Sequence, residues 1–99
     1  MSSIKLLKRA KVELRDACAW YERQQKGLSE RFLNEVENSF EKIISNPERY
    51  PKKYNTILHF APVKKFPYLI IYRYDEELDK IVITSIFHTK GDSGKFEFE

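Results

Sequence analysis

The pattern of hydrophobic and polar residues predicts four β-strands in this chain. The opening stretch SSIKLLK alternates Ile4 and Leu6 with Lys5, so we expect a strand that ends near Leu7 or Lys8. Three later segments, 57–63, 66–74 and 81–88, are rich in β-branched and aromatic residues. The middle one has three apolar residues in succession at 69–71, which indicates burial on both faces. We therefore expect it to be the central strand, with the other two as antiparallel neighbours.

Between the first strand and the other three, apolar residues recur at three and four positions, which predicts two helices. Gly27 ends the first helix, because a glycine there adopts positive φ without steric cost. Ser29 is the N-cap candidate of the second helix, which Asn46 and Pro47 stop. Two amphipathic helices with so short a link form an antiparallel hairpin. Their apolar faces consist of Ala10, Leu14, Ala17 and Tyr21, and of Phe32, Val36, Phe40, Ile43 and Ile44.

The predicted order of strand, two helices and three strands is an α+β layer structure. We expect an N-terminal strand and an α-helical hairpin packed on one face of a small twisted antiparallel β-sheet, whose other face meets solvent or a partner. The 99 residues suffice for a single domain, so we expect one domain over 1–99 with 91–99, GDSGKFEFE, as a flexible tail. Phe96 and Phe98 alternate with acidic residues, so this tail can add a short strand.

The composition, with 41% hydrophobic and 33% charged residues, is that of a folded soluble domain. No apolar run approaches the ~18 residues of a membrane span, and no signal-peptide core is present, so we expect a cytoplasmic protein without membrane contact. The single cysteine, Cys18, excludes an intrachain disulfide and a multi-cysteine metal cluster. Two distant histidines and three isolated glycines provide neither a metal signature nor a phosphate-binding loop. We expect no metal and no cofactor.

The net charge of +3 is modest, but basic residues gather in one part of the chain. Between residues 49 and 73 there is no Asp or Glu. The six basic residues there are Arg49, Lys52, Lys53, Lys64, Lys65 and Arg73. Lysines in this setting can protect a sheet edge against aggregation. The alternative is a basic face for an acidic partner or a phosphate backbone.

Four blocks cover the chain from roughly Ile4 to Asp92: AWYERQQKGLSERFLNEVE, NPERYP, KKFPYLIIYRYD and IVITSIFHTKGD. Their order and spacing resemble the RelE/ParE superfamily, the toxins of type II toxin–antitoxin modules. Members like RelE cut messenger RNA in the ribosomal A site, whereas members like ParE poison DNA gyrase. The short motifs WYE, GL, NP, YP and FPY resemble the ParE-type and plasmid-stabilisation branch. Leu69 stands at about the position where RelE-like nucleases carry an arginine.

This resemblance implies a toxin that binds and inhibits a target such as DNA gyrase and is neutralised by a cognate antitoxin. We expect antitoxin or target to contact the six basic residues from Arg49 to Arg73. The alternatives are a ribosome-dependent mRNA interferase, with ribosome and mRNA as partners, and a non-toxic interaction module of the same fold. A homodimer and a hetero-oligomer with the antitoxin both remain open. The nuclease candidates are Lys64, Lys65, Arg73, His88 and Lys90.

RNA cleavage through a 2'-hydroxyl needs a base, an acid and cations that stabilise charge on phosphorus. His88, at the end of the last strand, has a suitable ordinary pKa of roughly 6.5. A histidine at a strand end more often hydrogen-bonds locally, and this is the stronger interpretation. His59 has no better claim, because it lies within a strand.

The aromatic residues allow two interpretations. Trp20 and Tyr21 resemble a stacking platform for bases, but their place on a helix beside Ala17 favours core or hairpin packing. A second group, Tyr68, Tyr72 and Tyr74 with Phe66 and Ile70, shares one face of the central strand. That row is either core, with hydroxyls emerging at the rim, or an open surface for a protein or a single strand.

Overall fold

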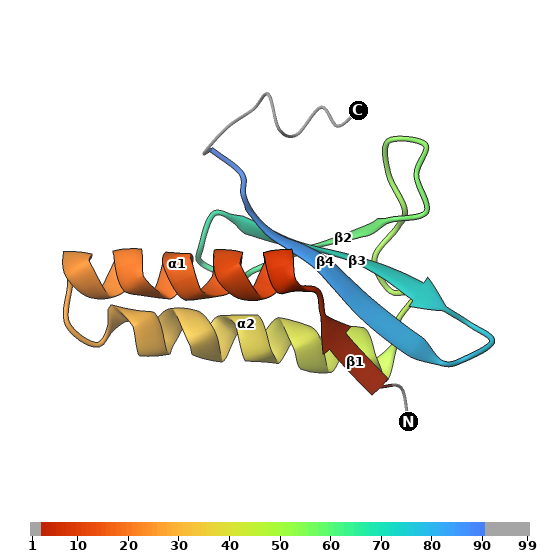
Figure 1. The fold of residues 1–99 in the computed structure, drawn as a ribbon, viewed down its shortest axis with the longest axis horizontal. Helices are drawn as coiled ribbons and strands as arrows, with labels where there is room; N and C mark the ends of the chain where they lie inside the picture. Colours follow the sequence, from red (N-terminus) through yellow and green to blue (C-terminus); the bar gives the residue numbers. More distant parts are fainter. Residues whose placement is uncertain (1–2, 91–99) are drawn as a thin grey trace.

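Two helices cover one face of a four-stranded sheet (Figure 1). The computed structural model describes residues 3–90, so the predicted tail at 91–99 lies outside the described residues. The elements are β1 (Ser3–Leu6), α1 (Lys8–Gln24), α2 (Leu28–Ser45), β2 (His59–Pro62), β3 (Tyr68–Asp75) and β4 (Lys80–His88). The helices run antiparallel, side by side, as their short link required (Figure 1). The predicted α+β architecture is confirmed.

The strand order is β1-β4-β3-β2. β3 pairs antiparallel with both β2 and β4, which confirms the prediction from its continuous apolar run. β1, however, runs parallel to β4, with Ile4 opposite Ile81, so the sheet is mixed and the prediction of an antiparallel sheet is wrong. Because β2 and β4 occupy both sides of β3, β1 takes the remaining side of β4. A parallel pair needs a crossover connection, and the helical hairpin lies in it.

Several element ends differ from the pattern-based prediction. β1 ends at Leu6, earlier than expected, and α1 already begins at Lys8. β2 and β3 begin at His59 and Tyr68 instead of at 57 and 66. The predicted end of the second helix is confirmed, because Ser45 is its last residue.

The link between the helices is built around the carboxylate of Glu22. Gly27 has the expected positive φ, 87°, but it precedes α2 instead of ending α1, which stops at Gln24. Ser29 lies inside the first turn of α2, so its prediction as the N-cap is wrong. Its N–H and its hydroxyl donate to Glu22 at 3.2 and 2.7 Å, and the Gly27 N–H donates at 3.0 Å. A side chain of α1 thus satisfies the free N–H groups of α2.

The aromatic row of β3 belongs to the core between sheet and helices. Ile70 and Tyr72 are fully buried, and Phe66, Tyr68 and Tyr74 pack against the same cluster. The Tyr72 hydroxyl donates to the Pro47 carbonyl at 2.8 Å, and the Tyr74 hydroxyl donates to the Asp79 carboxylate at 2.9 Å. The structure therefore favours the core interpretation, with hydroxyls that find partners at the rim.

The two aromatic residues at the end of α1 differ in environment. Tyr21 is buried, with its ring centroid 5.0 Å from that of Phe32 and 5.1 Å from that of Phe66. Trp20 is 50% exposed and contacts only the edge of Tyr21 among the described rings. Of the predicted core or hairpin packing, Tyr21 confirms the core part, whereas Trp20 is no core residue.

A carboxylate of α1 holds the helix to an irregularity in β4. The register of β4 against β3 shifts at Thr84, which forms a β-bulge. Directly after it, the Ser85 hydroxyl and the Ile86 N–H both donate to one oxygen of Glu13, at 2.8 and 2.9 Å. Arg9, one turn earlier on α1, pairs with the other oxygen at 3.2 Å. Glu13 therefore fixes which turn of α1 lies over the bulge.

We expect Glu13→Ala to lower the free energy of unfolding by about 1–3 kcal/mol, because it leaves two buried donors without their acceptor. Urea unfolding of the purified protein measures this loss. Glu37→Ala, at an exposed position of α2, is the matched control and is expected to change stability by less than about 0.5 kcal/mol. Equal effects of the two substitutions would contradict this role of Glu13.

The hydrogen bonds that Glu22 accepts, from Gly27 N–H first and then from Ser29, lower the pKa of this carboxyl. Because the pKa is lower in the folded state, its contribution to stability is present above the ordinary pKa of a glutamate and lost as pH falls through the folded value. Glu22→Gln should therefore be less stable than wild type at neutral pH, and the gap should close in acid. Denaturation midpoints measured over this range test the prediction, with Glu37→Gln as control. A gap that stays constant with pH would refute it.

Candidate functional site

A groove runs between α2 and the turn that joins β2 to β3. Lys64 and Lys65 form this turn, in which Lys65 has a φ of 71°. Two adjacent hollows of about 330 and 340 Å³ share Glu35 of α2 and meet Lys64 and Lys65 respectively. We call them together the α2 groove; its other lining residues are Leu28, Arg31, Asn34, Asn38, Glu41, Lys42, Ser45 and Phe66.

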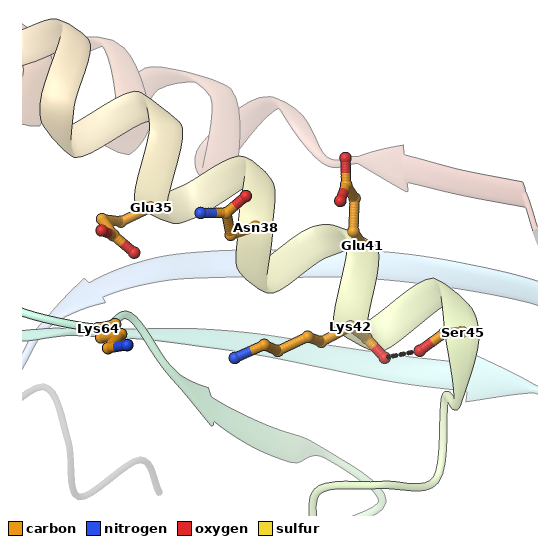
Figure 2. A pocket seen from close by; sticks show the side chains of 6 residues that line it. All are labelled: Glu35, Asn38, Glu41, Lys42, Ser45 and Lys64. Carbon is orange, nitrogen blue, oxygen red and sulfur yellow. Dashed lines mark hydrogen bonds between the residues drawn. The ribbon is translucent and has the colours of Figure 1, made fainter.

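The α2 groove is polar and carries both signs of charge. Figure 2 shows Glu35 pointing toward the turn and the long side chain of Lys42 extending toward Lys64. No ion pair joins the groove residues within the described part of the chain. These charges are therefore available to a partner that offers complementary groups along α2.

The structure divides the six predicted basic residues between two places, although all are exposed. Lys64 and Lys65 follow the end of β2. Arg49, Lys52 and Lys53 lie in the loop before β2. There the backbone of Lys52 forms an isolated antiparallel β-bridge with that of His59. Tyr72 also faces His59, so the next residue of β3, Arg73, lies at this second end. The four residues of β2, about 13 Å, separate the two groups, which a partner contacts together only if it spans the strand.

The five nuclease candidates do not converge on one point. The β2–β3 turn, the start of β3 and the end of β4 meet at one end of the sheet, since Tyr68 pairs with His88 and Thr89 N–H donates to the Pro67 carbonyl at 2.9 Å. Lys64, Lys65, His88 and Lys90 therefore share this end. Arg73 is five residues from Tyr68 along β3, which is about 17 Å. The structure thus separates Arg73 from the other four.

His88 engages in local contacts. Its Nδ1 accepts a hydrogen bond from the Lys90 N–H at 3.1 Å, and its ring meets Tyr68 edge-on with centroids 4.9 Å apart. Burial chiefly raises the pKa of Tyr68 to about 12, so this phenol is no base near neutral pH. The local hydrogen bond predicted for His88 is present.

His59 is a buried residue of the core side of the sheet. Its Nδ1 is hydrogen-bonded to the Tyr50 carbonyl, and its ring stacks on Tyr72 with centroids 4.9 Å apart. These contacts tie the loop before β2 to the central strand. These contacts give His59 a structural role in the fold.

The sheet face turned away from the helices carries an apolar group that we call the open-face cluster. Its members come from or border β2, β3 and β4: Leu58, Phe60, Leu69, Ile71 and Phe87. Leu69 and Ile71 alternate with Ile70, which packs in the main core, so they point to the opposite face. This confirms that β3 is apolar on both faces.

The sequence pattern predicted only the β3 members of the open-face cluster, Leu69 and Ile71. The members outside β3 were missed, although Phe60 and Phe87 each stand one residue from a core position, at Ala61 and Ile86. Alternation along β2 and β4 was the signal that would have found them.

Within residues 3–90, no three metal-ligating side chains come together. None of the helices described is long and apolar enough to span a bilayer.

A family model for the ParE toxin of type II toxin–antitoxin system, parDE, matches residues 4–93. The chain belongs to this family. It is therefore a type II toxin of the ParE/RelE superfamily, and the resemblance of its four sequence blocks is confirmed. No curated protein sequence matches the chain.

Solved structures share the fold of this ParE-family toxin at low sequence identity. The chromosomal ParDE TA system from P. aeruginosa is similar with a TM-score of 0.77 and 13% identity, over 91% of this chain and 98% of that one. The intact E. coli RelBE toxin–antitoxin complex gives 0.65 and 11%, over 88% and 95%. The RelBE2 complex from Mycobacterium tuberculosis gives 0.64 and 22%, over 88% and 90%. These likenesses concern the fold alone.

Proposed function

We propose that this toxin acts in the cytoplasm by binding and inhibiting DNA gyrase, as part of a plasmid-stabilisation type of module, and that a cognate antitoxin neutralises it. The observation that carries the proposal is the apolar surrounding of Leu69. Its side chain belongs to the open-face cluster, with Phe60, Ile71 and Phe87, at about the place where RelE-like nucleases carry an arginine. An apolar cluster cannot stabilise charge on phosphorus, but it suits a protein interface.

The spread of the basic residues also supports binding over RNA cleavage. General acid–base chemistry needs the reacting groups within hydrogen-bond reach of one substrate. Arg73 lies about 17 Å along β3 from the strand end that carries His88. The Nδ1 of His88 is already engaged by Lys90. The arrangement therefore leaves Lys64, Lys65, His88 and Lys90 at one end of the sheet without Arg73, the fifth candidate.

The antitoxin is proposed to be a segment that folds along the toxin. Two of the similar structures are named as toxin–antitoxin complexes, which makes an antitoxin the first partner to consider. The α2 groove offers a polar track with both signs of charge, and the basic residues beyond each end of β2 favour acidic side chains. A segment that is disordered when free can span both places and form a hetero-oligomer with the toxin.

Brief induction of the toxin without antitoxin should stop growth while transcripts stay intact, and the purified toxin should inhibit supercoiling by gyrase. His88→Ala should retain both effects, because the described contacts of His88, with the Lys90 N–H and the Tyr68 ring, are structural. A general acid or base would instead contribute about 10²–10⁴-fold to cleavage. Transcripts cleaved by wild type and spared by His88→Ala would establish the mRNA interferase alternative. Normal growth under strong induction would favour a non-toxic interaction module.

Charge reversal at either end of β2 should weaken antitoxin binding. We expect Lys52→Glu with Lys53→Glu, and separately Lys64→Glu with Lys65→Glu, to reduce affinity by about tenfold at low salt and by less at high salt. Lys8→Glu with Lys11→Glu, at exposed positions of α1, makes the same change of charge away from the proposed surface. Calorimetry with the purified antitoxin measures the affinities. Unchanged affinity for both β2 variants would contradict the proposed antitoxin surface.

A further inference from the structure

The loop before β2 contains a hairpin, residues 52–59, which projects from the sheet and which we call the arm (Figure 1). At its tip, Tyr54 and Asn55 have φ values of 58° and 55°, as the two central residues of a tight hairpin turn require. The Thr56 N–H and hydroxyl both donate to the Lys53 carbonyl, at 3.1 and 2.7 Å. These hydrogen bonds hold the arm in one conformation before a partner binds.

The arm presents basic and apolar side chains to solvent. Lys52 and Lys53 are exposed, and Ile57 is 65% exposed. Neither lysine forms an ion pair with any residue of 3–90. Because the arm is preformed, a partner binds it with little loss of conformational freedom. Its charge favours a partner that offers carboxylates beside an apolar side chain.

The turn between β3 and β4 offers this combination. Glu76, Glu77 and Leu78 follow one another there, and all three are exposed, Leu78 by 69%. The turn is also preformed, because the Leu78 N–H donates to the Asp75 carboxylate at 3.2 Å and the Asp79 N–H donates to the Glu76 carbonyl at 3.3 Å. The carboxylates of Glu76 and Glu77 form no ion pair within the described part of the chain.

The arm and the β3–β4 turn lie at the same end of the sheet (Figure 1). The base of the arm is at His59, which pairs with Tyr72, and β3 ends shortly after it at Asp75. Among the described residues, no ion pair joins the arm to the turn of its own chain. A two-fold axis at this end places the arm of each copy against the turn of the other copy, so one rotation satisfies both surfaces.

We propose that two copies of this toxin associate at this end, with the arm of each copy on the β3–β4 turn of the other. The two lysines of the arm pair with the two glutamates of the turn, and Ile57 contacts Leu78. Because the two contacts are equivalent, the association closes at a dimer. Exposed ion pairs are individually weak and are screened by salt, so the dimer forms at high protein concentration and low ionic strength.

Association covers Lys52 and Lys53, which also belong to the proposed antitoxin surface. The antitoxin therefore competes with the second copy, and its binding separates the dimer. This consequence rests on the proposed function, whereas the association itself does not.

Sedimentation analysis of the purified full-length toxin, without antitoxin, tests the association. Wild type should change from monomer to dimer as its concentration rises, and the dimer fraction should fall at high salt. Lys52→Glu with Lys53→Glu, and separately Glu76→Lys with Glu77→Lys, should each weaken association by at least about tenfold, because like charges then face each other. A wild type that stays monomeric at low salt, or that continues to larger assemblies, would overturn the proposal.

An equimolar mixture of these two charge-reversed variants provides a sharper test. In the first variant both the arm and the turn are acidic, and in the second both are basic. Each variant therefore repels its own copies, whereas a mixed pair has opposite charges at both contacts. The mixture should recover the dimer, and a mixture that stays monomeric would contradict the arrangement.

Two matched variants control for the change of net charge. Lys8→Glu with Lys11→Glu on α1, and Glu30→Lys with Glu37→Lys on α2, alter exposed residues of the helices and should associate as wild type does. Circular dichroism verifies that each variant is folded. Loss of the dimer in these controls would show that net charge alone governs association, which would overturn the assignment to the arm and the turn. Gyrase and antitoxin are absent from these measurements, so their outcome is independent of the proposed function.

Discussion

The carboxylate of Glu13 is the contact on which the alignment of the two layers depends. Apolar packing between helices and sheet is not directional, so it brings the layers together without choosing their register. Glu13 makes that choice, because its oxygen meets two donors beside the β-bulge only when one turn of α1 lies over Ser85. On the other helix, the Ser39 hydroxyl donates to the Pro62 carbonyl at 3.2 Å. The α2 groove owes its position to this pair of contacts.

The central strand separates the main core beneath the helices from a smaller apolar cluster on the other face of the sheet. On one side, Ile70 and Tyr72 are fully buried beneath the helices. On the other, Leu69 and Ile71 take part in a smaller cluster with exposed margins. Because residues of a strand alternate, the same short stretch stabilises the fold and shapes the surface that we propose a partner meets. Substitutions in β3 therefore affect folding and binding together unless they are confined to one face.

The features that the sequence predicted well are those encoded by neighbours in the chain. Helical and strand periods found all six elements, and a run of apolar residues identified β3 as central. The errors concern contacts between distant residues, such as the parallel pairing of β1 and the capping of α2 by Glu22. The basic residues were read as one group because they are close in sequence, whereas β2 holds them apart. Nothing in the local pattern around Trp20 distinguishes a core aromatic from an exposed one.

The pairing of β1 with β4 also has a consequence for synthesis of the protein. Ile4 pairs with Ile81, so this contact joins residues that are 81 − 4 = 77 positions apart. Such long-range pairing forms late, because the chain must first lose the entropy of closing a large loop. On the ribosome, β1 is made before β4 and must wait for β4 to emerge. The sheet is therefore completed only after β4 has been synthesised, so β1 has no strand partner while residues 7–79 are being made.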